Sequence, residues 1–555
     1  MNREIMKRNI ALLVFSFSCL ASFAQLDNTV EVTNEVKPVV TDVKKVDVKT
    51  QAADTKVTHY SMQYAVEGQP LNEYAPEPLG DYESEAVWKG NKKGYVHLSG
   101  GVLGSVDGKA VYQFDLAEND ALTLDLSLKG FNGKARKNGF FHPRDWKSRF
   151  YENRSALKFN HHFDNGVDFY VKGAYENHLY NYMVEEGAMD KQHDVLGNVL
   201  IGFTPFEVNN FSIEASAGVD FFSQNYRTSL EDKLGETLIH ADADAAYEFN
   251  DKHSVGLGLG FFHSAYGNKE LDGITRFRFT PHYIYSTNPF DLQLGLFVST
   301  KGNVAPDASF TYHINPKSDV FVSVSGSEVD NTFRLFSAEH PYFAMLDNLD
   351  KQKMEAAFYQ VEASIGYKFK NFYGLSGQIS GTYVQGKDEF AAEWLDTDIR
   401  GHQVGWIEFY KCTDFTIDAD FTYAYEDIVK LDAKNQIFIE KWEGEGESRW
   451  VKGNYTTPVF SMDWKADVKL MKGLYFGLDW RYGVYHQEDV GTEDDPQYKR
   501  PYTINLGASF RYTLPIKQPI TLFVKGDNLM NQNFDRYYGY RNIGANFLGG
   551  FALSF

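Results

Sequence analysis

The densest group of side chains that could bind a ligand is a basic segment at residues 131–149. Its cationic side chains are Lys134, Arg136, Lys137, His142, Arg144, Lys147 and Arg149. A guanidinium group can donate two parallel hydrogen bonds to a phosphate, so this segment is a candidate for binding an anionic glycan or glycolipid phosphate. The alternative, which we favour, is a solvated loop whose charges are paired with acidic neighbours.

Two aromatic-rich segments are the other candidates for specific contacts. Residues 331–346 carry Phe333, Phe336, Tyr342 and Phe343, and residues 427–457 carry Trp442, Trp450 and Tyr455. Large apolar patches are uncommon on surfaces that face water. We therefore expect each segment to fold inward, contact a partner protein or stack a ligand, with local packing as an equal alternative.

A third segment, residues 487–499, gathers the carboxylates Glu488, Asp489, Glu493, Asp494 and Asp495. Clustered carboxylates can hold calcium, but the spacing is not that of an EF-hand loop, and we favour a solvated acidic loop. The sequence contains no nucleophile elbow, HExxH motif or paired Cys and His ligands. It therefore predicts a protein that is not an enzyme and has no cofactor.

The elements that position these segments are read most easily at the end of the chain, residues 541–555. Apolar side chains occupy odd positions, at Ile543, Ala545, Phe547, Phe551, Leu553 and Phe555, and small or polar ones occupy even positions, apart from Leu548. Successive side chains of a strand point to opposite faces, so this stretch is predicted to be a strand. An exposed apolar edge strand would aggregate, whereas a closed barrel has no edge.

The same alternation recurs along the chain, most clearly at residues 211–221, 357–369, 460–470, 474–484 and 502–512. Long strands with continuous apolar faces and aromatic residues near their ends favour a membrane barrel over a β-sandwich. Tight connectors alternate with longer ones, which are predicted at 131–149, 327–354, 386–401, 427–457, 487–499 and 529–540. The pattern predicts an all-β fold, a transmembrane antiparallel outer-membrane β-barrel of about 22 strands with the short turns in the periplasm.

The domain organisation follows from composition. Residues 1–24 have a basic start, an apolar stretch from Ile10, and Ser22 and Ala24 before a predicted cleavage point, which indicates a signal peptide. Residues 25–90 are polar and are expected to form an extended periplasmic segment, and residues 91–555 are expected to form the barrel. The chain carries 55 basic and 75 acidic residues, a net charge of −20, which argues against nucleic-acid binding.

The segment 520–555, ITLFVKGDNLMNQNFDRYYGYRNIGANFLGGFALSF, resembles the C-terminus of TonB-dependent receptors. The matching residues are Asp527, Asn528, Leu529, Asn531, Tyr538, Gly539 and Tyr540, ahead of a final strand that ends in Phe555. The strand count is also that of the family. The segment EVKPVVTDVKKV at residues 35–46 resembles the opening of receptor-like barrels from Bacteroidetes.

The resemblance implies an integral outer-membrane protein that acts in passage or uptake of solutes, in contact with outer-membrane lipid and lipopolysaccharide. It also implies that the apolar end, with Phe551, Leu553 and Phe555, is recognised by the barrel-assembly machinery. Receptors of this family carry a plug domain longer than residues 25–90, so we expect a barrel without its plug. The alternative function is a structural or assembly subunit that scaffolds periplasmic or surface partner proteins.

Overall fold

The computed structural model describes residues 93–135, 146–183, 189–224, 234–267, 271–339, 357–397, 403–443, 458–485, 502–516, 520–532, 535–537, 540–541 and 543–555. All of them belong to the second of two compact units, Tyr64–Phe555. The first unit, Met1–Gln63, lies outside the described residues, as does the predicted periplasmic segment at 25–90.

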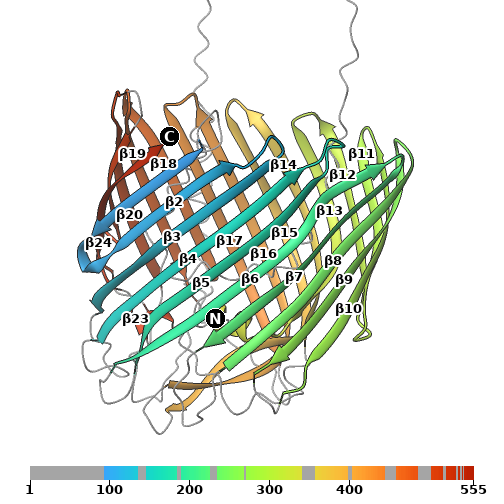
Figure 1. Ribbon diagram of the computed structural model, residues 1–555, viewed down its shortest axis with the longest axis horizontal. Coiled ribbons are helices and arrows are strands. Elements are labelled where there is room, and N and C mark those ends of the chain that lie inside the picture. Colours follow the sequence, from blue (N-terminus) through green and yellow to red (C-terminus); the bar gives the residue numbers. More distant parts are fainter. Residues whose placement is uncertain are drawn as a thin grey trace, which may run out of the picture. The chain divides into compact units, whose positions relative to one another are not determined.

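The described residues form a closed antiparallel barrel of 22 strands (Figure 1). The barrel strands are β1 (Gly94–Gly101), β2 (Val106–Asp115), β3 (Asp120–Ala135), β4 (Trp146–His162), β5 (Asp168–Met183), β6 (Met189–Val208), β7 (Phe211–Gln224), β8 (Leu234–Asn250), β9 (His253–Tyr266), β10 (Ile274–Thr287), β11 (Phe290–Ser299), β12 (Val304–Asn315), β13 (Ser318–Asp330), β14 (Ala357–Phe372), β15 (Leu375–Thr397), β16 (Gln403–Tyr425), β17 (Val429–Glu443), β18 (Phe460–Met471), β19 (Leu474–Val484), β20 (Tyr502–Thr513), β21 (Ile520–Asp527) and β24 (Asn546–Ser554). The predicted fold class and strand number are confirmed.

Three smaller elements complete the described structure. These are a 3-10 turn (Val102–Gly104), the helix α2 (Phe333–Glu339) and a two-stranded sheet of β22 (Asp535–Tyr537) and β23 (Tyr540–Arg541). No helix among the described residues is long and apolar enough to cross a membrane.

The barrel closes where its first strand meets its last. β1 pairs with β2 on one side and with β24 on the other, from Tyr95 opposite Ser554 to Gly101 opposite Leu548. A main-chain oxygen of Phe555 accepts hydrogen bonds from the N–H groups of Lys93 and Gly94, each at 2.9 Å. Because both ends of the sheet are paired with each other, the barrel leaves no open edge.

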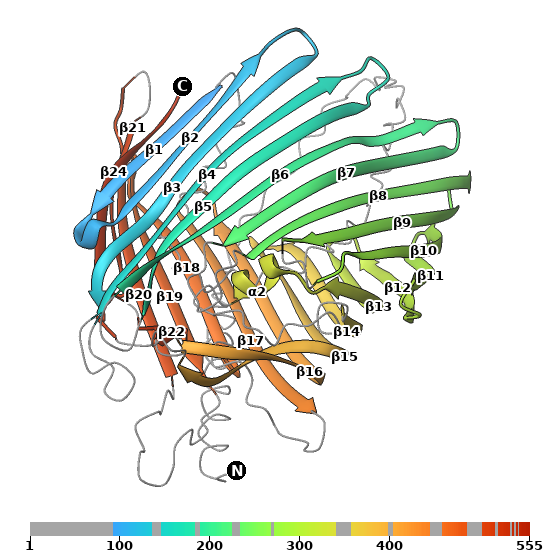
Figure 2. The same ribbon diagram turned by 60° about the horizontal axis from the view of Figure 1, so that its bottom comes forward.

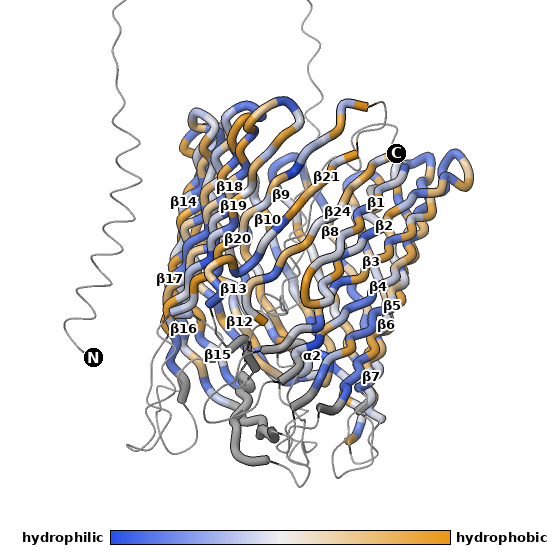
Figure 3. Tube along the Cα trace, turned by 90° about the vertical axis from the view of Figure 1, so that its left-hand side faces the viewer, coloured by the Kyte–Doolittle hydropathy of each residue, from blue (hydrophilic) through white to orange (hydrophobic). Residues whose placement is uncertain are grey.

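Each strand presents an apolar face outward and a polar face to the lumen, as its alternating sequence requires. On β8, Ile239 and Tyr247 are exposed on the outer face, while Glu236 and Asp242 belong to the opposite, inner face. Figure 3 shows this as alternation of hydrophilic and hydrophobic colour along the strands. We call the inward-facing side chains of the strands the lumenal wall.

Several predicted boundaries are corrected by the structure. The predicted loop at 427–457 contains a whole strand, β17, whose outward positions include Ala433 and Asn435 and so lack a continuous apolar pattern. The predicted loops at 131–149, 327–354 and 386–401 are shorter, because their flanking strands continue into them. The final strand begins at Asn546 rather than Arg541, because Gly544 turns the chain with a φ of 82°.

One part of the wall is doubled. β12 and β13 are paired only between Ala308–Asn315 and Ser318–Val324, but β13 stays paired with β14 as far as Asp330. Beyond Val324, β13 contacts the inward-facing residues of β12, β11 and β10 instead. The part of β13 after Val324 therefore lies over the inner face of its neighbours and leads the chain into the lumen, where α2 begins.

Candidate functional site

A buried group of charged side chains holds the inward-leaning end of β13 in place. The Arg276 guanidinium on β10 forms an ion pair with Asp330, and Arg278 pairs with the second oxygen of the same carboxylate. Glu328 lies 3.5 Å from Arg276 and accepts hydrogen bonds from Ser299 Oγ at 2.6 Å and Asn303 Nδ2 at 2.8 Å. Buried carboxylates paired in this way fix the position of a strand, because separating them would leave charges unpaired.

The helix α2 follows directly and lies inside the barrel (Figure 2). Thr332 precedes it and caps it, since its Oγ1 accepts the N–H of Leu335 at 2.9 Å. Phe333 and Phe336 are buried, with 1% and 2% of their surface exposed, and the Phe333 ring lies 5.2 Å from that of Tyr266 on β9. The helix thus buries its aromatic face against the lumenal wall.

Three carboxylates on neighbouring strands bind the polar groups of α2. Glu236 on β8 accepts the backbone N–H of Arg334 at 3.2 Å, and Asp194 on β6 accepts the hydroxyl of Ser337 at 3.2 Å. The Arg334 side chain reaches Asp220 on β7 at 3.5 Å. A carboxylate beside the first turn of a helix satisfies N–H groups that lack an intrahelical partner. The three carboxylates of the lumenal wall therefore form the docking surface of α2.

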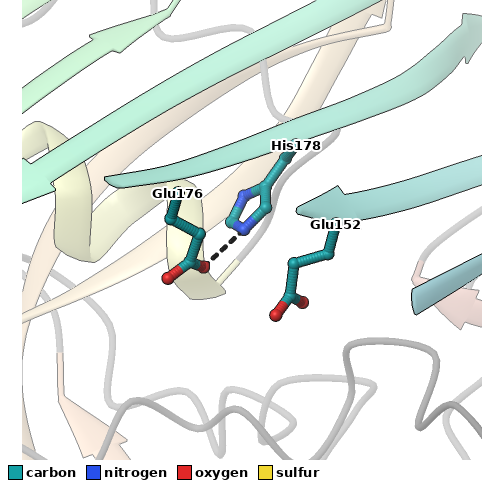
Figure 4. Close-up of side chains that lie close together, drawn as sticks. All are labelled: Glu152, Glu176 and His178. Atoms are coloured by element: carbon teal, nitrogen blue, oxygen red, sulfur yellow. Dashed lines mark hydrogen bonds and ion pairs between the residues drawn. The ribbon is translucent and has the colours of Figure 1, made fainter. Parts of the chain in front are cut away.

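Beside this docking surface, β4 and β5 bring together two carboxylates and an imidazole (Figure 4). His178 Nε2 lies 2.6 Å from Glu176 Oε1, and one donor atom each from Glu152, Glu176 and His178 lies within 4.8 Å of the other two. Glu152 and His178 are opposite each other in the strand register. We call these three side chains the lumenal triad. Imidazole and carboxylate are ligands for divalent transition metals, and the same groups can also form a hydrogen-bonded network without an ion.

The triad adjoins the α2 docking surface through the strand register. His178 on β5 is opposite Asp194 on β6, and Asp194 is opposite Gln224 on β7. Asp194 also accepts a hydrogen bond from the Tyr180 hydroxyl at 3.2 Å, and that hydroxyl accepts one from Gln224 Nε2 at 3.2 Å. The row from Glu152 to Gln224 is therefore a continuous polar band on the lumenal wall.

The residues proposed from the sequence lie in several places. Phe333 and Phe336 are in α2, packed on the wall, so the described part of the segment, residues 331–339, folds inward, which is one of the alternatives given for residues 331–346. Trp442 is near the end of β17, opposite Cys412, rather than in a loop. Arg149 lies in β4 opposite Asn132, and Lys134 lies in β3 opposite Lys147.

Other proposed residues fall outside the described parts of the chain. These are Arg136, Arg144, Tyr342, Trp450 and the acidic segment 487–499, and the side chains of Lys134 and Trp442 are also not described. Their roles in binding stay predictions. Phe551 and Phe555 are exposed on the outer side of the barrel end, and Leu553 is half-buried, so the apolar terminus is presented as expected, while its recognition by assembly machinery stays a prediction.

The triad and the three carboxylates that bind α2 were not among the residues predicted from the sequence. Each carboxylate is an ordinary inward-facing polar residue when its strand is read alone. Within β5, the Glu-x-His spacing of Glu176 and His178 places both on one face. That spacing could have indicated a pair of possible metal ligands on β5. The proximity of Glu152 to this pair depends on the register between β4 and β5 and could not be predicted from either strand alone.

No known protein family and no curated protein matches the sequence. Solved structures do match the fold. The FrpB iron transporter from Neisseria meningitidis (F3-3 variant) has a TM-score of 0.65 and 11% identity, covering 84% of this chain and 82% of that one. The ferric-catecholate import receptor Fiu from Escherichia coli K12 has a TM-score of 0.60 and 10% identity, covering 84% and 82%.

The siderophore receptor PirA from Acinetobacter baumannii gives a TM-score of 0.61 at 9% identity, covering 84% of this chain and 80% of that one. These structural neighbours are TonB-dependent receptors, which are transporters or receptors and not enzymes. The likeness extends over most of the barrel, and at this identity it concerns the fold. The fold is that of an integral outer-membrane protein.

Proposed function

We propose that this chain, whose barrel has the fold of the TonB-dependent receptors, acts in the passage or uptake of solutes across the outer membrane without a conventional plug and without catalysing a reaction. The observation that carries the proposal is the closed 22-strand barrel with an apolar outer face and a polar lumenal wall. Barrels of this size enclose a lumen wide enough to need an obstruction. Here α2 supplies part of one, because it lies against the wall inside the barrel.

The nature of the solute is also a proposal. FrpB is named as an iron transporter, Fiu as a ferric-catecholate import receptor and PirA as a siderophore receptor. Metal chelates are therefore the first solutes to test. The polar band on the wall, which contains both carboxylates and an imidazole, supports a path for polar rather than apolar solutes.

The test uses the full-length protein reconstituted in planar bilayers and in liposomes. Solute passage predicts ionic conductance and swelling of liposomes in iso-osmotic small sugars, and entry of a ferric chelate into liposomes that contain an iron-sensitive dye. An infolded helix also suits a closed scaffold, which is the second candidate function. A barrel that gives no signal in any of these three measurements and co-purifies with one partner at fixed stoichiometry would overturn solute passage in favour of scaffolding.

A further inference from the structure

We propose that Glu152, Glu176 and His178 form a binding site for a divalent transition-metal ion on the lumenal wall. The inference goes beyond the proposed function, since passage of solutes needs no resident metal site. It rests on three side chains of the ligand type, on their convergence and on the rigidity of the strands that carry them.

The first argument is convergence. One donor atom from each side chain lies within 4.8 Å of the other two, and His178 Nε2 and Glu176 Oε1 are already 2.6 Å apart. An ion bound at roughly 2.0–2.2 Å from each ligand holds its ligands about 3–3.5 Å apart. The Glu176 and His178 donor atoms are closer than this, so an ion that replaces the hydrogen bond between them moves them apart by less than about 1 Å, and Glu152 turns toward them as the third ligand. Figure 4 shows the imidazole between the two glutamates.

The second argument is the backbone. Glu152 and His178 are register partners on adjacent strands, and Glu176 is two residues before His178 and so on the same face. β4 and β5 are paired over thirteen consecutive residues, from Phe150–Tyr180 to His162–Asp168. Ligands carried on paired strands are held more accurately than ligands on loops, so little ordering is required when an ion binds.

The third argument is the charge around the triad. Lys129 is the register partner of Glu152, Arg154 is the register partner of Glu176, and Asp194 is the register partner of His178. Arg334 of α2 also interacts electrostatically with Glu176, so three carboxylates face three cationic side chains and the wall around the triad carries no net positive charge that would repel a cation. The attraction between the triad carboxylates and an ion is stronger in this partly buried position than in open water.

Among the described residues, only the triad brings three such ligand atoms together. His240 has Asp220 at 3.4 Å from its Nε2 and Asp242 at 4.0 Å from its Nδ1, on opposite sides of the ring. His313 has Asp319 at 2.7 Å from its Nδ1 and Asp291 at 2.9 Å from its Nε2. The two carboxylates are therefore on opposite sides of the ring and cannot share one ion with one nitrogen. His161 and His162 each have a single close carboxylate, Asp120 and Asp168.

The ligand set also decides the class of ion. Calcium and magnesium take oxygen ligands almost exclusively, whereas imidazole with carboxylate suits Zn²⁺, Co²⁺, Mn²⁺ and Fe²⁺. The three protein ligands leave the remaining positions of the ion to water. A half-open site of this kind binds its ion reversibly.

The experiment titrates the full-length protein in detergent with Co²⁺, followed by visible absorption, and then displaces Co²⁺ with Zn²⁺. We expect one Co²⁺ per chain for the wild type and binding weakened by at least about 10-fold in Glu152→Gln and in His178→Gln, because loss of a ligand exceeds the loss of an outer-shell partner. The matched control His313→Gln should bind as the wild type does. Equal binding by all variants, a weakened control, or no binding by the wild type would overturn the proposal.

Folding of each variant is checked by the shifted gel mobility of the unheated barrel. A second measurement, on the wild-type protein alone, tests the site even if a variant does not fold. X-ray absorption of the wild-type protein loaded with one equivalent of Zn²⁺ should show one imidazole and otherwise oxygen ligands. A shell without imidazole, or with sulfur, would contradict the site. Neither measurement depends on transport, so the result stands whatever the reconstituted barrel conducts.

Discussion

Arg276 on β10 and Glu328 on β13 lie 3.5 Å apart, between Nη1 and Oε1, although their strands are not neighbours in the barrel. Their side chains have 1% and 0% of their surface exposed. The contact exists because β13 leaves β12 after Val324 and crosses the inner face of the wall. α2 begins three residues after β13, so the buried ion pairs that hold the end of β13 also fix the position of α2.

The first prediction concerns Asp330, whose carboxylate pairs with Arg276 and Arg278. Asp330→Asn leaves two guanidinium groups without this counter-charge, and breaking a buried ion pair costs about 3–5 kcal/mol. We expect a loss of that order in the free energy of unfolding, measured by urea titration of the protein in lipid vesicles. Asp432→Asn, which removes an exposed pair with Lys430, is the control and should change the stability by less than about 1 kcal/mol.

The second prediction tests the close approach of β13 to β12. A Cβ on Gly326 would lie 2.1 Å from the Cβ of Ala305, and neither atom can rotate away. Gly326→Ala should therefore push the two strands apart and lower the free energy of unfolding by about 1–3 kcal/mol. Gly381→Ala is the matched control, because a Cβ there meets nothing within 4 Å. Equal stability of the two variants would show that β13 does not pass over Ala305.

The third prediction concerns α2 as an obstruction. The double change Phe333→Ala with Phe336→Ala removes both buried rings, and each large-to-small change of this kind costs about 3–5 kcal/mol. A seven-residue helix cannot stay docked after that loss, so the conductance in planar bilayers should rise above the wild-type level. Phe249→Ala, at an aromatic residue exposed on the outer face, should leave conductance unchanged. An unchanged conductance in the double variant would mean that α2 does not narrow the lumen.

The barrel itself could be predicted from the sequence because the alternation of apolar and polar residues that defines each strand lies within that strand. β19 was predicted at residues 474–484 and is observed as Leu474–Val484, since alternation in each strand decides which side faces lipid. β17 was not predicted because Asn435 interrupts the apolar pattern of its outward face. The Asn435 side chain accepts a hydrogen bond there from Trp464 Nε1 at 3.0 Å. A polar residue there is satisfied by a neighbouring strand, which the sequence of β17 alone does not reveal.

The candidate site could not be predicted in the same way because it depends on register. Glu152 and His178 are 26 positions apart and meet only because β4 and β5 pair in one particular alignment. A shift of one residue would turn either side chain to the lipid face. The contact of Asp330 with β10 is harder still to predict from the sequence, because β10 and β13 share no backbone pairing.

The fourth prediction concerns Phe555, where the barrel closes. Its backbone bonds Gly94 and Lys93, and its ring stacks on Tyr112 with centroids 6.1 Å apart. Phe555→Ala keeps the backbone bonds but removes the ring, which should cost about 1 kcal/mol of stability for a side chain that is only half covered. If the terminal aromatic is also read during assembly, the amount of folded barrel in the outer membrane should fall several-fold, more than this stability change explains.

The matched control for Phe555 is Phe547→Ala. Phe547 is on the outward face of β24, the strand that Phe555 follows, and has 47% of its surface exposed, against 43% for Phe555. Removing its ring should cost similar stability and leave the assembled amount near the wild-type level, measured by quantifying heat-modifiable protein in isolated outer membranes. Equal losses in both variants would assign the effect to lost apolar surface and remove the case for a signal at the chain end, because only position distinguishes the two rings.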